Sequence, residues 1–516
     1  MNTAERIVYK TSLDLLLDGI ADLSQELPPE FDVRVSGVQL DSRLVKTGDL
    51  FMACFGRNHD ARDYIDLAID KGAVAVVAHA GGAWQGVSVR RGVIVMAIDN
   101  LSARTGEIAA RFYDEPSAAM TMIGVTGTNG KTSCTQFIAQ ALSAMQRKCG
   151  LIGTIGYGLY GDLQESAYTT PDPVFLQSLL AQMRLQGADT VAMEVSSQGL
   201  HQNRVNGVRF DVAVFTNLTR DHLDYHGSME AYAETKARLF MIDSLSSAVV
   251  NVDDPYAPTI LNCVAPTVKT HTFSVTSPHA DVYALQLELH RTGYKALVRT
   301  PFGDGTMNGR LLGRFNFSNL LAVLTTLIAT ESSRSDFRLD TLLDRLSCLQ
   351  PVTGRMEIVG DSTDITVVVD YAHTPDALRS ALIALREHFS GNVWCVFGCG
   401  GNRDQGKRPM MAEAAEQYAD RLIVTDDNPR TECADDIIRQ ILLGIEDSSR
   451  MVVERDRAKA ITLAITSAVR GDVVLIAGKG HENYQDVNGK KMVFSDVAQA
   501  RLALQARSKS TNTASV

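Results

Sequence analysis

Short apolar segments of strand-like composition alternate with helical patterns along almost the whole chain, and this alternation restricts the fold more than any other feature. It is typical of α/β proteins, because parallel strands are connected by crossover helices. It disfavours β-sandwiches and helix bundles. The segments expected to form strands are 48–53, 73–78, 93–98, 121–125, 190–195, 211–215, 248–251, 365–370, 393–397, 422–425 and 473–477.

The strand-like segments form three series, and a chain of 516 residues is too long for one hydrophobic core. We therefore predict three domains, 1–102, 103–350 and 351–516. Pro351 and Gly354 separate a helical pattern from a new strand at the second boundary. From residue 506 small and polar residues prevail, which predicts a disordered tail.

Composition excludes several classes of protein. A formal net charge of −10 argues against a general attraction to nucleic acid. Charged residues interrupt the first 22 residues, so they lack the apolar core of a signal peptide, and the most apolar internal run, 320–329, is too short to cross a bilayer. None of the eight cysteines forms a Cys-x-x-Cys pair, which favours reduced thiols over zinc or disulfides. We expect a cytoplasmic protein without membrane insertion.

A phosphate-binding loop is predicted after the strand at 121–125. Gly127-Thr128-Asn129-Gly130-Lys131-Thr132-Ser133 lies between that strand and a helical pattern at 134–145. Backbone N–H groups at such a helix start bind phosphate, Lys131 neutralises its charge and Thr132 can ligate magnesium. Val125 stands where the usual Walker spacing has glycine, so the loop is a variant. The alternative without a function is a tight turn that happens to carry a lysine.

Two further strand ends carry polar clusters, 193–200 and 216–224. Glu194, at the carboxyl end of a strand beside the predicted phosphate loop, suits magnesium, which takes few, hard ligands. His222 is a less usual magnesium ligand, and ordinary loop polarity is the alternative for both residues. Lys236, taken alone, reads as a solvated helix lysine.

In the third predicted domain, four strands end in polar loops, 370–376, 398–407, 426–430 and 478–482. Loops at the carboxyl ends of parallel strands converge on one crevice, where ligands bind. The segment Asp427-Asn428-Pro429-Arg430 places a guanidinium, whose fork matches a carboxylate, on a loop fixed by proline. A lone segment of this kind would be a turn.

Together these motifs resemble the Mur ligase family, whose ATP loop is also similar to that of the folylpolyglutamate synthases. The resemblance covers essentially the whole chain apart from the tail. It implies a central domain with a P-loop-type parallel sheet, a smaller N-terminal domain for a uridine nucleotide and a Rossmann-like C-terminal domain. It also implies ATP as co-substrate and Mg²⁺ as cofactor.

The resemblance assigns roles residue by residue. It implies that Lys131, His222 and a carbamylated Lys236 are catalytic, and that Thr132, Glu194, His222 and Lys236 are associated with metal. The implied ATP contacts are Gly127, Thr128, Asn129, Gly130, Lys131, Thr132, Ser133, Asn316, Asn319, Arg355 and Asp370. Helix capping is an equal alternative for Asn316 and Asn319.

Two substrate sites are also implied. The contacts to a UDP-muramoyl peptide would be Leu40, Ser42, Arg57, Asn58, His59, Thr169, Thr170, Ser196, Gln202 and Arg204. Tyr168 and Gln198 depart from the family pattern, where asparagine and histidine are frequent. The contacts to diaminopimelate would be Arg403, Asp427, Asn428, Pro429, Arg430, Gly478 and Glu482, because members of the family that add lysine lack the arginine of Asp-Asn-Pro-Arg.

The activity expected from the resemblance is ATP-dependent addition of meso-diaminopimelate to UDP-N-acetylmuramoyl-L-alanyl-D-glutamate, through an acyl phosphate, in peptidoglycan biosynthesis. The chain is expected to act as a monomer on these small molecules. A folylpolyglutamate synthase shares the ATP loop but should lack the uridine-binding first domain and the Asp-Asn-Pro-Arg loop. A non-catalytic nucleotide switch is the alternative from another class, since a phosphate loop alone reports only phosphate binding.

Overall fold

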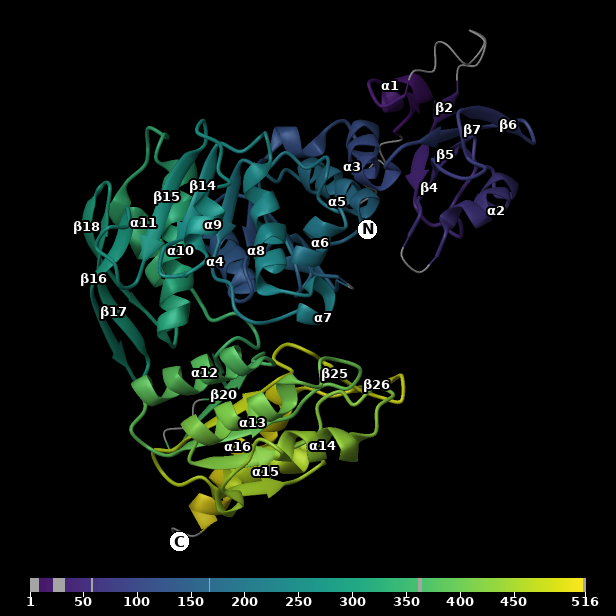
Figure 1. Ribbon diagram of the computed structural model, residues 1–516. Coiled ribbons are helices and arrows are strands. Elements are labelled where there is room, and N and C mark those ends of the chain that lie inside the picture. The colour runs from purple at the N-terminus through teal and green to yellow at the C-terminus, as the bar shows by residue number, and fades with distance from the viewer. Residues whose placement is uncertain (1–8, 22–32, 57–58, 167, 361–363, 514–516) are drawn as a thin grey trace.

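A computed structural model shows three α/β units, each built on its own sheet (Figure 1). The structure describes all residues except 1–8, 22–32, 57–58, 167, 361–363 and 514–516. The predicted class, a three-domain α/β protein with mainly parallel sheets, is confirmed. No helix of the described residues is long and apolar enough to span a membrane.

The first unit has a five-stranded sheet in the order β3-β4-β5-β7-β6, in which only β6 runs antiparallel. One face packs on α1 and α3, and the other on α2. Helix α3 also contacts the next unit, since a side chain at Gly106 would meet the carbonyl of Asn206. The predicted boundary at 102 falls in this shared helix and stays a prediction. The elements are β3 (Gly37–Gln39), β4 (Asp49–Ala53), β5 (Ala75–His79), β6 (Val87–Arg90), β7 (Val93–Ile98), α1 (Leu13–Leu17), α2 (Ile65–Asp70) and α3 (Leu101–Phe112), with the small pair β1 (Thr11–Ser12) and β2 (Arg34–Val35).

The middle unit holds an eleven-stranded sheet, β11-β10-β9-β12-β8-β13-β14-β15-β16-β17-β18. It is parallel from β9 to β16, but antiparallel hairpins extend both edges, which the sequence analysis did not predict. The strands are β8 (Thr121–Thr126), β9 (Cys149–Ile152), β10 (Tyr157–Leu159), β11 (Asp162–Gln164), β12 (Thr190–Glu194), β13 (Val212–Phe215), β14 (Ser247–Asn251), β15 (Lys269–Ser274), β16 (Val282–His290), β17 (Gly293–Thr300) and β18 (Gly303–Gly309).

Helices cover both faces of this sheet. Apolar residues of α4, α10 and α11 pack on one face, and those of α5 and α8 on the other. Every residue of β12 and β14 is consequently buried, and the central residues of both strands, 191–193 and 248–250, are all apolar. The helices are α4 (Lys131–Ala144), α5 (Pro173–Leu185), α6 (Ser197–His201), α7 (Leu223–His226), α8 (Met229–Ala237), α9 (Ala257–Leu261), α10 (Arg314–Glu331) and α11 (Leu339–Ser347).

The third unit has a six-stranded sheet, β19-β20-β24-β21-β22-β23, parallel except for β19. Helices α12 to α14 cover one face, and α15 and α16 the other. The elements are β19 (Glu357–Ile358), β20 (Thr366–Asp370), β21 (Val393–Phe397), β22 (Arg421–Val424), β23 (Met451–Val453), β24 (Val473–Ala477), the hairpin β25 (Tyr484–Val487) with β26 (Lys490–Val493), α12 (Pro375–His388), α13 (Lys407–Tyr418), α14 (Ala434–Leu442), α15 (Arg457–Ser467) and α16 (Asp496–Thr513).

The predicted disordered tail needs a correction. Helix α16 continues through residue 506 as far as Thr513. Arg507 pairs with Asp364 at 2.7 Å and donates to the carbonyl of Ile465, also at 2.7 Å. Polar composition suggested disorder, but these contacts tie this part of the helix to the third unit.

The third unit contacts the middle unit beside the start of α10 (Figure 1). The N–H of Gly313 donates to Nε2 of His388 at 2.8 Å, and Arg314 pairs with Glu387 at 2.7 Å. A second contact joins Asn483 to Glu165 at 3.1 Å. These contacts hold the third unit against the middle unit.

Candidate active site

The phosphate loop has the predicted order of strand, loop and helix: β8 ends at Thr126 and α4 begins at Lys131. Gly127 and Gly130 have φ values of 148° and 88°. An added Cβ would lie 1.9 Å from Thr216 Oγ1 at Gly127 and 2.3 Å from Asn319 Oδ1 at Gly130. Both glycines are therefore required by backbone conformation and by close packing.

Neighbouring backbone holds the loop in place. The N–H groups of Thr128 and Asn129 donate to the carbonyl and the side-chain oxygen of Asn217, at 2.8 and 2.9 Å. Lys131 folds back and donates to the carbonyls of Gly127 and Thr128, at 2.8 and 2.9 Å. Burial lowers the pKa of Lys131, although Glu194 and Asp221 oppose this shift. The lysine is thus held close to the loop by two neutral acceptors.

Glu194 ends β12 directly beside this loop and is 1% exposed. Thr132 donates to Glu194 Oε2 at 3.0 Å, and the N–H of Thr154 donates to Oε1 at 2.7 Å. A side chain at Gly153 would lie 2.2 Å from Glu194 Oε1, so glycine leaves room for the carboxylate. A carboxylate and a hydroxyl oxygen stand side by side, which is a hard donor set.

Lys236 lies on α8 and is 1% exposed, so the interpretation of a solvated helix lysine is wrong. Its ammonium donates to the carbonyl of Gly127 at 2.9 Å and lies 4.6 Å from the centre of the Tyr232 ring. Burial, and next the charge of Lys131, hold the pKa of Lys236 well below its ordinary value. This environment favours a neutral amine.

His222 has φ 54° and places Nε2 3.4 Å from a carboxylate oxygen of Asp221. Burial lowers its pKa, and the charges of Lys131 and Lys236 act in the same direction, while Asp221 opposes them. Two lysines, a histidine and Asp221 therefore share one electrostatic environment beside the phosphate loop.

The described residues contain no group of three or more His, Cys, Asp or Glu that could hold a metal on their own. Magnesium keeps water ligands and is commonly held by one or two carboxylates together with substrate phosphates. Thr132 and Glu194 supply such a partial set.

The predicted nucleotide residues of α10 lie against the loop. Asn319 Nδ2 is 3.4 Å from Asn316 Oδ1, and Asn316 donates to the carbonyl of Leu312 at 2.9 Å. The capping alternative is not supported, because Gly313 is the N-cap of α10 and no side chain caps it. Asn319 Oδ1 instead lies beside Gly130 of the phosphate loop.

Two residues approach from the third unit. Arg355 Nη2 donates to Thr132 Oγ1 at 3.4 Å, and its guanidinium lies 4.4 Å from the centre of the Tyr371 ring. Asp370, at the end of β20, accepts from the N–H groups of Met356 and Ala372, both at 2.8 Å. Burial raises the pKa of Asp370, and the charge of Arg355 opposes that shift. Arg355 thus connects the third unit to the phosphate loop.

The predicted muropeptide residues of the middle unit form one cluster. Arg204 donates to the carbonyl of Thr170 at 2.7 Å and to Gln202 Oε1 at 2.7 Å. Thr170 accepts from the N–H of Ser196 at 3.0 Å, and Thr169 lies 3.0 Å from Thr154 Oγ1. These contacts lead from Arg204 to Glu194.

Tyr168, the departure noted in this segment, is 63% exposed and its ring lies 5.4 Å from the Arg204 guanidinium. It therefore supports an arginine already held by Gln202 and Thr170. Gln198 lies in the short helix α6, whose N-cap Ser196 accepts from the N–H of Gly199.

The predicted uridine residues lie apart from this cluster, in the first unit. Ser42 is 7% exposed, in a turn after β3. Leu40 follows β3 directly, and His59 is exposed. Arg57 and Asn58 lie outside the described residues. Among the residues that are described, Leu40, Ser42 and His59 make no hydrogen bond or ion pair with the cluster around Arg204.

The loops of the third unit converge as predicted. Asn428 donates to Glu482 Oε2 at 2.8 Å, and Gly478 packs so closely on Asp427 that a Cβ would lie 2.6 Å from its carboxylate. Arg430 donates to the carbonyl of Gly401 at 2.7 Å. A Cβ at Gly400 would lie 2.9 Å from Arg430 Nη1 and 3.8 Å from Arg403 Cγ. All seven predicted amine-site residues thus lie in one network of loops, with Pro429 between Asn428 and Arg430.

The two arginines of this network differ from the other arginines nearby. In the described part of the chain, neither Arg403 nor Arg430 has a carboxylate partner, although Arg408, Arg455 and Arg457 do. Arg403 donates to the carbonyl of Asn402 at 3.3 Å and is exposed. Their positive charge remains available to a ligand.

Sequence reasoning missed Lys479, which is fully buried in the same network. Its ammonium donates to Asn428 Oδ1 and Glu482 Oε2, both at 2.9 Å. It lies between Gly478 and Glu482 in the sequence, so proximity to two predicted residues was the available signal. The composition of the loop does not reveal that the lysine is buried.

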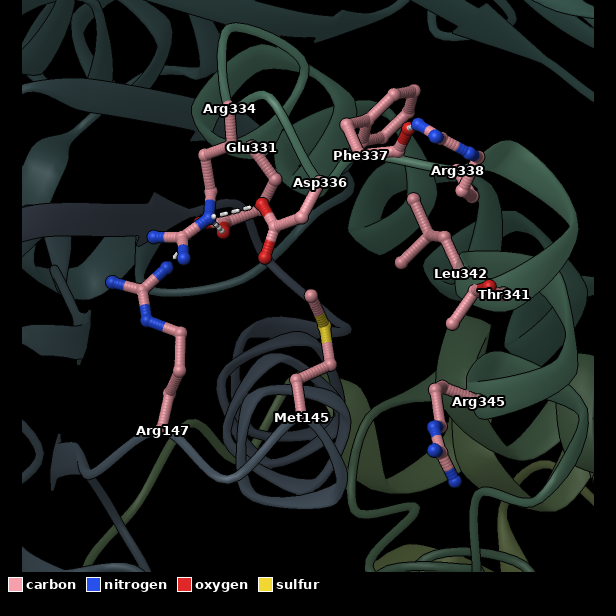
Figure 2. A pocket seen from close by; sticks show the side chains of 10 residues that line it. All are labelled: Met145, Arg147, Glu331, Arg334, Asp336, Phe337, Arg338, Thr341, Leu342 and Arg345. Carbon is pink, nitrogen blue, oxygen red and sulfur yellow. Dashed lines mark hydrogen bonds and ion pairs between the residues drawn. The ribbon is translucent and has the colours of Figure 1, made fainter.

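A pocket lies at the far end of α4 and α10 from the phosphate loop and is lined by Arg147, Glu331 and Arg345 among others (Figure 2). None of the predicted site residues lines it. The candidate active site is instead the region where Arg355 of the third unit meets the phosphate loop.

Three family descriptions match successive parts of the chain. "Mur ligase family, catalytic domain" matches residues 34–113, "Mur ligase middle domain" matches 125–327 and "Mur ligase, glutamate ligase domain" matches 354–480. They follow the three sheets of the fold.

Two similar sequences carry the name UDP-N-acetylmuramoyl-L-alanyl-D-glutamate–2,6-diaminopimelate ligase. The one from Coxiella burnetii is 49% identical over 92% of this chain and 96% of its own length. The one from Pseudomonas aeruginosa is 46% identical over 94% of this chain and 98% of its own length.

Two solved structures are also similar to this chain. One of a protein with the same ligase name has 37% identity and a TM-score of 0.71, covering 97% of this chain and 99% of that one. A Mycobacterium tuberculosis folylpolyglutamate synthase, at 17% identity and a TM-score of 0.61, covers 77% of this chain and 93% of its own, which shows a shared fold alone. On the sequence matches, the chain belongs to the Mur ligase family.

Proposed function

We propose that this protein is an ATP-dependent ligase that adds meso-diaminopimelate to UDP-N-acetylmuramoyl-L-alanyl-D-glutamate in peptidoglycan biosynthesis. The relatives with this ligase name are similar over nearly the whole chain. The observation that carries the choice of amine is the pair of guanidiniums, Arg403 and Arg430, that lack a carboxylate partner among the described residues. A diaminopimelate has a second carboxylate for them, and lysine does not.

In the proposed reaction the γ-carboxylate of D-glutamate attacks the γ-phosphorus of ATP, which gives an acyl phosphate and ADP. The amine of diaminopimelate then attacks the acyl carbon, phosphate leaves, and the amine loses a proton. Lys131 and the N-terminal N–H groups of α4 stabilise charge on the transferred phosphoryl group. Arg204 holds the muropeptide, and Arg355 and Asp370 bring the third unit over the nucleotide, which excludes water from the acyl phosphate.

Magnesium is part of the proposal. Thr132 and Glu194 would hold it, with His222 close by, and when bound it would neutralise phosphate oxygens. The side-by-side oxygens of Thr132 and Glu194 support this assignment.

Lys236 is proposed to be carbamylated. A neutral amine can add to CO₂ and release a proton, which converts the neutral side chain into an anionic carbamate. Burial and the lowered pKa of Lys236 favour the neutral amine that this step needs. Intact-protein mass measured under native conditions should show the addition of CO₂, and Lys236→Ala should remove it together with activity. Full activity in Lys236→Ala would contradict the role.

Incorporation of radiolabelled amine into the UDP-muramoyl dipeptide tests the function as a whole. Product should require ATP, magnesium and the dipeptide, and diaminopimelate should be preferred to lysine. A folate acceptor with glutamate serves as the control for the related synthases. Transfer of glutamate to folate, or ATP hydrolysis that ignores all acceptors, would refute the proposal.

A further inference from the structure

Two loops of the third unit are joined into one body, the double loop, defined as residues 398–406 and 426–432. The N–H of Gly401 donates to the carbonyl of Asn428 at 2.9 Å, and Arg430 donates back to the carbonyl of Gly401. Thr431 donates to Asn402 Oδ1 at 3.0 Å. The double loop is the part of the fold that presents Arg403 and Arg430.

An ion pair joins the double loop to α13, with its arginine fully buried. Arg408, on α13, is 0% exposed, and its two terminal nitrogens contact the two oxygens of Glu432 at 2.7 and 2.8 Å. It also donates to Gln440 Oε1 at 2.7 Å and to the carbonyl of Gly400 at 3.2 Å. Such a two-point contact fixes orientation as well as distance.

Glu432 is fully engaged by these contacts. Besides Arg408, it accepts from the N–H of Asn402 at 2.9 Å and from Gln405 at 3.2 Å. The hydrogen bonds from Arg408 lower its pKa to about 2, so it is ionised at neutral pH. An ionised carboxylate on the same double loop as two guanidiniums is a candidate partner for them.

Gly400 lies beside all three arginines of this region. A Cβ added at Gly400 would lie beside Arg430 Nη1 and Arg403 Cγ, and the carbonyl of Gly400 accepts from Arg408. Three arginines therefore surround one turn of the double loop. In the described chain the buried one is paired with a carboxylate and the other two are not.

We propose that Arg408 is a positioning residue: it holds Glu432 away from Arg403 and Arg430, so that both guanidiniums stay free for the distal carboxylate of the amine substrate. This inference rests on the proposed function and explains how the selectivity of that site is maintained. Arg408 acts through Glu432 and need not touch the substrate. Its removal should harm selectivity mainly by releasing a competing carboxylate.

The test compares Arg408→Met with the double variant Arg408→Met/Glu432→Gln, using kcat/KM for diaminopimelate and for lysine. Arg408→Met should lower the diaminopimelate-to-lysine ratio by about 10-fold to 100-fold, the range expected for substrate misplacement. The double variant should recover most of the ratio, because the competing charge is gone. A purely structural role predicts that the double variant is no better than the single one.

Arg147→Met is the matched control. Arg147 also forms a buried pair with a glutamate, Glu331, but in the distant pocket (Figure 2). The variant Arg147→Met should lower the Tm and leave the diaminopimelate-to-lysine ratio of kcat/KM unchanged. If Arg408→Met folds poorly, Arg408→Lys keeps the charge without the two-point contact and should give a smaller loss of ratio.

Calorimetric binding of diaminopimelate separates the two proposals. A parent protein that binds diaminopimelate but incorporates no amine refutes the proposed function, while weaker binding in Arg408→Met with recovery in the double variant still supports the positioning role. An unchanged ratio and unchanged binding in Arg408→Met would overturn the inference. So would a double variant as impaired as Arg408→Met.

Discussion

The phosphate loop and the double loop hold their positive charges in different ways. At the phosphate loop, Lys131 and Lys236 of α8 donate to backbone carbonyls of the loop, and within the described chain neither forms an ion pair with a carboxylate. At the double loop the charges are arginines, and the buried one, Arg408 of the adjoining helix α13, is neutralised by Glu432. The lysines of the first region can change their charge, whereas the arginines of the second region stay charged.

The difference follows from what each region must recognise. Burial shifts the pKa of both lysines downward, so their charge responds to a nearby anion such as a developing phosphate charge. An arginine stays charged and offers a fixed fork, which suits a carboxylate that is present throughout the reaction. The comparison predicts that substitutions in the phosphate loop reduce turnover, whereas substitutions in the double loop reduce selectivity.

Lys131→Ala should give the largest effect, a loss in kcat of about 10²-fold to 10³-fold or more, because it removes a cation that stabilises charge developing on phosphate. Steady-state kinetics with both amines should show equal losses. Lys148→Ala, which changes an exposed lysine just beyond the same helix, is the control and should keep activity. Near-normal turnover in Lys131→Ala would place the ATP site elsewhere.

Arg430→Ala should give the next largest effect, and this effect is on the selectivity for diaminopimelate over lysine. Leaving the distal carboxylate of diaminopimelate poorly paired in a closed crevice costs about 2–5 kcal/mol, or on the order of a hundredfold in the diaminopimelate-to-lysine ratio. Lysine use should change little.

The measurement for Arg430 is kcat/KM for both amines, with ATP and dipeptide saturating. Arg439→Ala, whose side chain is 75% exposed on α14, is the control. Equal losses for both amines would mean that Arg430 only supports the loop, and an unchanged ratio would remove diaminopimelate as the substrate assigned from this motif.

Much of the fold could be predicted because buried parallel strands are continuous apolar runs. The segments 393–397 and 473–477 match β21 and β24 to the residue, and 121–125 falls one residue short of β8. The antiparallel strands β16 to β18 were missed, because alternating buried and exposed residues with interspersed glycines give no such run.

Site residues that belong to short sequence motifs could be predicted, as in the phosphate loop and Asp-Asn-Pro-Arg. Burial of a cation cannot be read from such motifs. Lys236 therefore reads as solvated, and Arg408 and Lys479 attract no notice, although all three are buried. Their surroundings come from segments far away in the sequence, such as Gly127 for Lys236 and Asn428 for Lys479.

The smallest expected effect concerns stability in acid and involves histidines beside the phosphate loop and in the third unit. Burial is the first cause that lowers the pKa of His226, beside the phosphate loop, and of His373 and His481, in the third unit, each to about 4. In the unfolded chain these groups titrate near 6.5. Between about pH 6.5 and 4 the unfolded state therefore binds more protons than the folded state, so stability is complete above this window and falls as the pH is lowered through it.

Calorimetric Tm measured from pH 7 to pH 4 should decrease by several degrees, at about 2–4 °C for each kcal/mol lost. His481→Gln should flatten this decrease, because it removes one buried group that must stay neutral. Its Nδ1 has no hydrogen-bond partner among the described residues, so glutamine loses no bond at that atom. His279→Gln, an exposed histidine in a turn, is the control and should leave the slope unchanged. A Tm that is equally steep in His481→Gln would mean that carboxylates, rather than neutral buried histidines, govern acid stability in the third unit.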